Sequence, residues 1–244
     1  MNSLFAALQF FTVLPISKSF NEKEIGGILP FFPSVGLVLG LLIMGVFLFL
    51  SIFLKSPLLL AFLMVALLAW LTGGLHLDGL ADTFDGLWSA RDKERILEIM
   101  RDSRIGAMGV LGLFFVLGLK VLSLSYLSFD LAWKALLLAP VFSRSLMVGI
   151  IYFMPYARQS GMAKIFCDHK KLWHVLVALS FSLALGFSLL QLYFLLPLCF
   201  CFLAVGALLY RSHKLIGGMT GDVLGASAEL AEAFFFLSLT FLGV

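Results

Sequence analysis

Three aspartates with helical spacing give this chain its clearest chemical signal. Asp78, Asp82 and Asp85 stand in the stretch 73–86, at offsets of 0, 4 and 7. On an α-helix these offsets place the three carboxylates within roughly 60° of one another, on one face. Carboxylates held so close repel one another unless a cation lies between them, and a divalent metal is well suited to oxygen ligands of this kind. The spacing therefore predicts a metal site, and the alternative is a solvated helix face with one aspartate as its N-cap.

Two glycine-rich stretches elsewhere in the chain are suited to binding an anion. Each precedes an apolar run, 105–129 in one case and 223–243 in the other. Glycine permits close backbone approach, and the unpaired N–H groups of a helix's first turn attract phosphate. We therefore expect phosphate or substrate contacts from Asp102, Ser103, Arg104, Gly106, Gly217, Gly218, Thr220 and Gly221. A simpler alternative stays open for each stretch: an Arg104–Asp102 pair at the membrane surface, and a flexible turn before the last run.

Asp222 and Arg158 extend the same chemistry. Asp222 lies in the second glycine-rich stretch, where it would be a fourth metal ligand or the N-cap of the following helix. Arg158 lies in a turn at 155–161, and with Arg104 it would neutralise phosphate charge through paired N–H donors. Carboxylates, glycine turns and arginines together predict Mg²⁺-dependent transfer of a phosphate-linked group, in which catalysis is mostly positioning and charge neutralisation.

The elements that must position these side chains are membrane-spanning helices. Of the 244 residues 61% are hydrophobic and only 13% charged, and the mean hydropathy is +1.07, whereas soluble domains average about 25% charged residues. Apolar runs longer than 18 residues, without strand-like alternation, predict an all-α, polytopic integral membrane bundle. We expect a single transmembrane catalytic domain over 1–244 with about seven spans: 28–54, 57–75, 105–129, 131–153, 172–190, 192–210 and 223–243.

Two shorter helices are expected at the membrane surface. The apolar N-terminal segment ends near Pro15 and is too short to span comfortably, so it is expected to lie in the interface or to re-enter. Ser89 and Asp92 have the spacing of a capping box, which predicts a helix over about 90–102. That helix mixes apolar and charged residues, as surface-lying helices do.

The distribution of cations predicts the orientation of the chain. Thirteen of its 17 Lys and Arg residues fall in segments that share the inner side if the N-terminus is cytoplasmic. Lys55 alone falls outside, and Lys120, Lys134 and Arg144 lie within spans. Because cytoplasmic loops carry an excess of Lys and Arg, we expect a multi-pass protein of the cell's inner membrane whose active face is cytoplasmic.

Four blocks of the sequence carry a resemblance to a known family: GGLHLDGLADTFDGL, MRDSRIGAMGVL, PYARQSGMAKIF and GGMTGDVLGA. In this order, and with the N-terminal FFTVLPI segment, they resemble cobalamin synthase, the adenosylcobinamide-GDP ribazoletransferase family. The resemblance covers nearly the whole chain. It implies an Mg²⁺-dependent enzyme of late cobalamin biosynthesis that joins adenosylcobinamide-GDP to α-ribazole or its 5′-phosphate and releases GMP.

The resemblance also suggests roles for individual residues. Mg²⁺ on the substrate pyrophosphate would be held by the carboxylates Asp78, Asp82, Asp85 and Asp222. The catalytic groups would be Asp82, Arg104 and Arg158, with one carboxylate taking the proton of the attacking ribose hydroxyl and the arginines neutralising charge. The expected partners are these substrates and the lipid bilayer, without nucleic acid. A homo-oligomer and a complex with other corrinoid-synthesis enzymes both stay open.

Two other functions compete with this one. The Asp triplet is distantly similar to the CDP-alcohol phosphotransferases, although Asp82 stands where their signature requires a different residue. A transporter would instead use the ionisable residues expected inside the membrane, namely Arg144, Glu229 and Glu232. The polar residues concentrate in loops on one side, which favours the enzyme.

Overall fold

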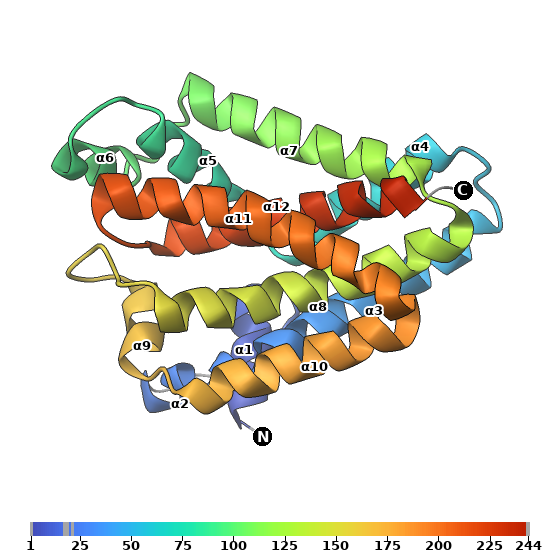
Figure 1. Ribbon diagram of the computed structural model, residues 1–244, viewed down its shortest axis with the longest axis horizontal. Coiled ribbons are helices and arrows are strands. Elements are labelled where there is room, and N and C mark those ends of the chain that lie inside the picture. Colours follow the sequence, from blue (N-terminus) through green and yellow to red (C-terminus); the bar gives the residue numbers. More distant parts are fainter. Residues whose placement is uncertain (1, 17–19, 21, 243–244) are drawn as a thin grey trace.

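The computed structural model describes residues 2–16, 20 and 22–242, and all regular secondary structure in that part of the chain is helical (Figure 1). The longer helices are α3 (Phe32–Ser51), α4 (Pro57–Leu71), α5 (Leu75–Leu87), α7 (Ala107–Tyr126), α8 (Phe129–Phe153), α10 (Leu172–Leu190), α11 (Leu195–Ile216) and α12 (Gly221–Leu239). The shorter ones are α1 (Asn2–Phe11), α2 (Glu22–Gly26), α6 (Lys93–Ile99), α9 (Met162–Asp168) and the 3₁₀ turns η1 (Leu29–Phe31), η2 (Gln191–Phe194) and η3 (Thr240–Leu242). The all-α prediction is confirmed.

The described residues contain five helical stretches that are long and apolar enough to cross a membrane, or six if the bent pair α4 and α5 is counted as one span. One of the five, Leu172–Ile216, contains both α10 and α11, which diverge from η2 in Figure 1. A polytopic membrane bundle is therefore confirmed. The count of seven spans and the cytoplasmic N-terminus stay predictions.

The predicted span 57–75 ends early, and a sharp bend follows it. Helix α4 stops at Leu71, and α5 starts at Leu75 with its axis turned by 92°. Gly73 and Gly74 form the bend with φ of +60° and +71°, a backbone region that a side chain would strain. Because of this bend, α5 and its aspartates do not continue along the axis of α4.

Helix α5 lies against the first turns of α7 and α12. A Cβ added to Gly79 would lie 2.8 Å from the backbone oxygen of Asp222, and one added to Gly109 would lie 3.0 Å from that of Ala81. Only glycine permits such close backbone approach. Helix α5 is therefore packed tightly against both helices, and near its carboxyl-terminal end Asp85 lies level with the start of α7.

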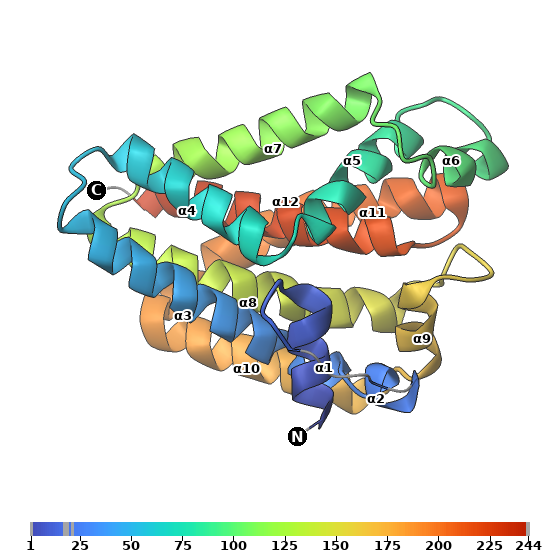
Figure 2. The same cartoon turned by 180° about the vertical axis from the view of Figure 1, so that it is seen from behind.

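The polar segments gather at one end of the bundle. Figures 1 and 2 place α6, the loop after α8 and the loop between α11 and α12 at the same end, and the loop after α3 at the other. This grouping agrees with the cation distribution, although Lys18 lies outside the described residues. Helix α11 continues to Ile216 instead of ending at 210, so its last turns carry two of these cations.

The short surface helix is shorter than expected and has a different cap. It begins at Lys93, and Asp92 caps it by accepting a hydrogen bond from the backbone N–H of Arg95 at 3.0 Å. The capping box expected from Ser89 is wrong, because the Ser89 hydroxyl donates instead to the carbonyl of Gly86 at 2.7 Å.

Candidate active site

A cavity of about 700 Å³ opens at the polar end of the bundle, between α1, α2, the start of α5, the loop after α8, α9 and the start of α12. Its charged lining residues are Asp78, Arg158 and Asp222. The sequence placed these three residues on separate segments, and the fold brings them to one wall. The cavity therefore offers two carboxylates and a guanidinium to one ligand.

An ion pair joins Arg158 to Asp222. The Nη2 atom of Arg158 lies 2.8 Å from a carboxylate oxygen of Asp222 and also donates to the carbonyl of Met100 at 3.3 Å. The loop that carries Arg158 is tied to the α11–α12 loop by two backbone hydrogen bonds of 2.9 Å, from Met219 to Pro155 and from Ala157 to Met219. The Nε atom of Arg158 is buried without a hydrogen-bond partner among the described residues, so a donor remains for a ligand.

Asp82 lies next to this wall, on the same helix as Asp78. Burial raises the pKa of Asp82 to about 7, and the negative charges of Asp222 and Asp78 add to the effect, while Arg158 opposes it. A carboxyl group with this pKa changes its ionisation near neutral pH. A bound cation or an incoming proton would relieve the repulsion.

Asp85 has a different environment from Asp78 and Asp82. Its two carboxylate oxygens accept hydrogen bonds from the backbone N–H groups of Gly106, at 2.7 Å, and Gly109, at 2.8 Å. Asp85 thus caps the N-terminus of α7, where the sequence predicted that a substrate phosphate would bind. In the structure, Asp78, Asp82 and Asp222 lie close enough to affect one another's charge, whereas the Asp85 carboxylate binds the N-terminus of α7.

The second glycine-rich stretch mainly shapes the start of α12. Gly217 ends α11 in the left-handed conformation, with φ of +80°, and a Cβ on Gly218 would lie 2.2 Å from the carbonyl oxygen of Pro155. Thr220, rather than Asp222, is the N-cap of α12, with its hydroxyl accepting from the N–H of Val223 at 3.2 Å. Within this stretch, Gly221 and Asp222 line the cavity.

Arg104 is not brought to the cavity. It forms hydrogen bonds of 2.7 to 3.3 Å with Asp102, its side chain is 87% exposed, and Ser103 beside it is exposed as well. The hydrogen bonds from Arg104 lower the pKa of Asp102 to about 2. This is the membrane-surface pair that the sequence left open, and Arg104 is not among the residues that line the cavity, where it was expected to neutralise phosphate charge.

The donor chemistry fits Mg²⁺ only in part. Among the described residues, no three Asp, Glu, His or Cys side chains are grouped so that they could hold a metal ion by themselves. Mg²⁺ commonly needs only one or two carboxylates, because substrate phosphate oxygens and water complete its coordination. Asp78 and Asp222, on one cavity wall, meet that smaller requirement.

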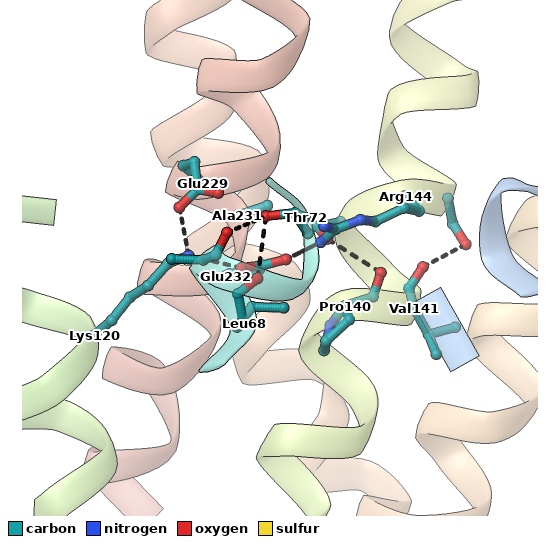
Figure 3. Close-up of polar contacts among 12 residues, drawn as sticks. Leu68, Thr72, Lys120, Pro140, Val141, Arg144, Glu229, Ala231 and Glu232 are labelled. Carbon is teal, nitrogen blue, oxygen red and sulfur yellow. Dashed lines mark hydrogen bonds and ion pairs between the residues drawn. The ribbon is translucent and has the colours of Figure 1, made fainter. Parts of the chain in front are cut away.

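The intramembrane charges form a network in which Lys120 joins Arg144, Glu229 and Glu232, the three ionisable residues that the sequence singled out inside the membrane. Lys120 of α7 lies 2.6 Å from both Glu229 and Glu232 of α12, and Arg144 of α8 pairs with Glu232 (Figure 3). Ser143 adds a hydrogen bond of 3.1 Å to Glu232. All four charged side chains are at least 94% buried, and two cations balance two anions. The network joins three helices, and this favours a structural role over a transport path.

Comparison with known proteins gives a consistent result over the full length. Residues 3–240 match the family described as cobalamin-5-phosphate synthase. An adenosylcobinamide-GDP ribazoletransferase of Alkaliphilus oremlandii is 38% identical over 240 residues, which cover 98% of this chain and 96% of that protein. Proteins of the same name from Geotalea daltonii and Klebsiella pneumoniae strain 342 are 39% and 40% identical, and each alignment covers at least 97% of both chains. No solved structure matches the chain.

Proposed function

Because the chain belongs to the cobalamin-5-phosphate synthase family, we infer that it is an adenosylcobinamide-GDP ribazoletransferase, acting at the last step of cobalamin biosynthesis. In this reaction a ribose hydroxyl of α-ribazole, or of its 5′-phosphate, attacks the phosphorus next to the corrinoid. The new phosphorus–oxygen bond joins the two halves of the cobalamin, the bond to the GMP phosphate breaks, and the hydroxyl proton passes to a base. The structural observation that best supports this proposal is the cavity wall formed by Asp78, Arg158 and Asp222.

The residues of this wall and the neighbouring Asp82 would have separate roles in the reaction. The buried Nε of Arg158 has no partner in the described part of the chain, so it is free to donate to a phosphate oxygen. Asp82 is suited to take the hydroxyl proton, because a base is most effective when its pKa lies near the working pH. Asp78 and Asp222 would hold Mg²⁺ together with the phosphate oxygens. When bound, the metal would neutralise the charge of the pyrophosphate.

The location of the site supports a cytoplasmic active face. The cavity is lined by the loop after α8 and the start of α12, and Figure 2 places these segments at the end of the bundle where α6 lies. Since cations concentrate on the cytoplasmic side of membrane proteins, we propose that the enzyme resides in the cell's inner membrane with this end in the cytoplasm. Nucleotide-linked substrates would then reach it from the cytoplasm. Self-association and complexes with other corrinoid enzymes stay predictions.

The direct test is a reconstituted reaction. Detergent-purified protein with adenosylcobinamide-GDP, α-ribazole 5′-phosphate and Mg²⁺ should release GMP and form the cobalamin product in equal amounts. A chelator should stop the reaction, and added Mg²⁺ should restore it. Arg158→Lys keeps a cation but loses the Nε donor and the planar fork, so turnover should fall by about 10²-fold or more. Undiminished turnover in the chelator would exclude the proposed metal requirement.

The same assay separates the competing functions. A lipid-headgroup enzyme would release CMP from a CDP-alcohol instead of GMP. A transporter would move a substrate into proteoliposomes without forming a covalent product. The network of Lys120, Arg144, Glu229 and Glu232 favours the enzyme over the transporter, because its two cations and two anions pair with one another inside the bundle.

A further inference from the structure

The cavity has two chemically different sides. The charged wall comes from α5, α12 and the loop after α8, as described above. The opposite side comes from α1 and α9, whose lining residues are Ala6, Gln9, Phe10, Phe11, Met162, Ala163 and Phe166. Among these described residues only Gln9 has a polar side chain. A ligand that fills the cavity should therefore be charged at one end and flat and apolar at the other.

The apolar side is a packed aromatic wall. Phe10 and Phe166 meet edge to face, with ring centroids 5.4 Å apart, and Phe32 of α3 packs against both Phe11, at 4.6 Å, and Phe166, at 5.7 Å. Phe11 and Phe166 are each only 1% exposed. Phe10 is only half-buried and is the ring of this wall with the largest accessible surface, while the buried rings support it from behind. Since rings from three helices hold one another in place, the wall is preformed.

One buried polar atom lies at the junction of the two sides. His76 lines the cavity two residues before Asp78, with its ring 5.6 Å from that of Phe11. The side chain is 2% exposed, and its Nε2 atom has no hydrogen-bond partner among the described residues. Buried polar atoms are nearly always paired, and leaving one unpaired costs free energy. A ligand atom that hydrogen-bonds to Nε2 would remove that cost.

We propose that this aromatic side binds the base of the α-ribazole substrate, with His76 Nε2–H donating to the ring nitrogen that carries no sugar. The proposal rests on the function proposed above, and it names the residues that would bind one end of the α-ribazole substrate. A benzimidazole-type base is a flat ring with a single free ring nitrogen, which matches one donor in an aromatic wall. Its ribose and phosphate would then extend toward Asp78, Arg158 and Asp222.

The other ring systems of the reaction fit this wall less well. Guanine presents several donors and acceptors on its edges, and most of these would stay unpaired against Phe10, Phe11 and Phe166. A cavity of about 700 Å³ suits a ligand of nucleoside size. The corrinoid macrocycle, which is far larger, would remain outside, toward the open end.

The first test uses two phenylalanines of the same helix. Phe10 lines the cavity, whereas Phe5 is 42% exposed and does not line it. Phe10→Ala should raise the KM for α-ribazole about tenfold, the equivalent of about 1.4 kcal/mol, with little change in kcat or in the KM for adenosylcobinamide-GDP. Phe5→Ala should leave all three values unchanged. A rise only in the KM for adenosylcobinamide-GDP would place guanine on the wall and overturn the proposal.

The second test concerns His76 and uses binding rather than turnover. Titration calorimetry without adenosylcobinamide-GDP compares α-ribazole with an analogue that carries C–H in place of the free ring nitrogen. The wild-type chain should bind the analogue about tenfold more weakly, and His76→Leu should bind both ligands equally. His76→Gln, which keeps an N–H donor, should retain part of the preference. If His76→Leu keeps the full preference, or if the wild type has none, the contact does not exist.

These outcomes can be told apart from failure of the proposed function. If the wild type forms neither GMP nor a cobalamin product, the function itself fails. If it turns over normally and Phe10→Ala has an unchanged KM for α-ribazole, only the assignment of the base fails. Should His76→Leu not fold, His76→Gln and the wild-type comparison of the two ligands still decide the question.

Discussion

At the scale of single residues, Asp82 should set the pH dependence of the reaction. Its pKa is raised to about 7 by burial and by the neighbouring carboxylates, so below that pH the group is protonated and cannot accept a proton. We expect kcat/KM to rise about tenfold per pH unit below 7 and to level off above it. A higher Mg²⁺ concentration should shift this rise in kcat/KM to lower pH, because a nearby cation lowers the pKa of Asp82. The measurement is a pH–rate profile at two Mg²⁺ concentrations.

The same group carries a matching prediction for variants. Asp82→Asn should abolish the rise of kcat/KM with pH below 7 and lower kcat by about 10²-fold or more. Asp130→Asn is the control, since Asp130 is exposed and pairs with Lys134 at the start of α8, away from the cavity. Near wild-type, Mg²⁺-dependent turnover in Asp82→Asn would exclude this residue as base and as metal ligand.

Asp85 is expected to act on stability more than on chemistry. Its carboxylate caps α7 through the N–H groups of Gly106 and Gly109, so Asp85→Ala should cost about 1–2 kcal/mol and lower the melting temperature. Asp85→Asn keeps one acceptor oxygen and should lose less stability while retaining turnover. Loss of activity in Asp85→Asn without a change in melting temperature would instead show that Asp85 is a metal ligand, as the sequence suggested.

At the scale of elements, the contact between α5 and α12 fixes the distance between the two halves of the site. A Cβ at Gly79 would lie 2.8 Å from the backbone oxygen of Asp222, so Gly79→Ala must push the helices apart and separate Asp78 from Asp222. We expect at least a tenfold loss of kcat/KM for this variant. Gly118→Ala in α7 is the matched control, because nothing lies within 4 Å of its added Cβ. It should be neutral or slightly stabilising, since alanine favours a helix.

The apolar helices could be predicted from the sequence, but contacts between them could not. Long apolar runs gave helix boundaries close to those of α3, α7, α8, α10 and α12, because membrane spans depend on local composition. Spacing alone also identified Asp78 and Asp82, since both lie on one helix. The pairing of Asp85 with α7 and that of Arg158 with Asp222 join residues far apart in the chain. No local pattern encodes those distances, and Arg104 shows how a plausible spacing can belong to an exposed pair.

At the scale of the whole molecule, the buried charge network holds three helices in register. Within the described residues, Lys120 pairs with Glu229, and both Lys120 and Arg144 pair with Glu232. Lys120→Met leaves two buried glutamates with one cation, which should cost about 3–5 kcal/mol. Thermal unfolding in detergent should show a markedly lower melting temperature for this variant. Lys134→Met, which removes a cation whose partner Asp130 is 67% exposed, should cost about 1 kcal/mol or less.

A second substitution distinguishes lost charge balance from lost packing. Lys120→Met combined with Glu229→Gln leaves Arg144 and Glu232 as one balanced pair, so the double variant should regain much of the stability that the single variant loses. Turnover should recover together with stability. Glu229 and Glu232 lie on the same helix as Asp222, so the network acts on the site only by holding α12 in place. If stability returns but turnover does not, these charges have a direct part in the reaction. If neither returns, the aliphatic packing of the Lys120 side chain matters more than its charge, and the network does not set the position of α12.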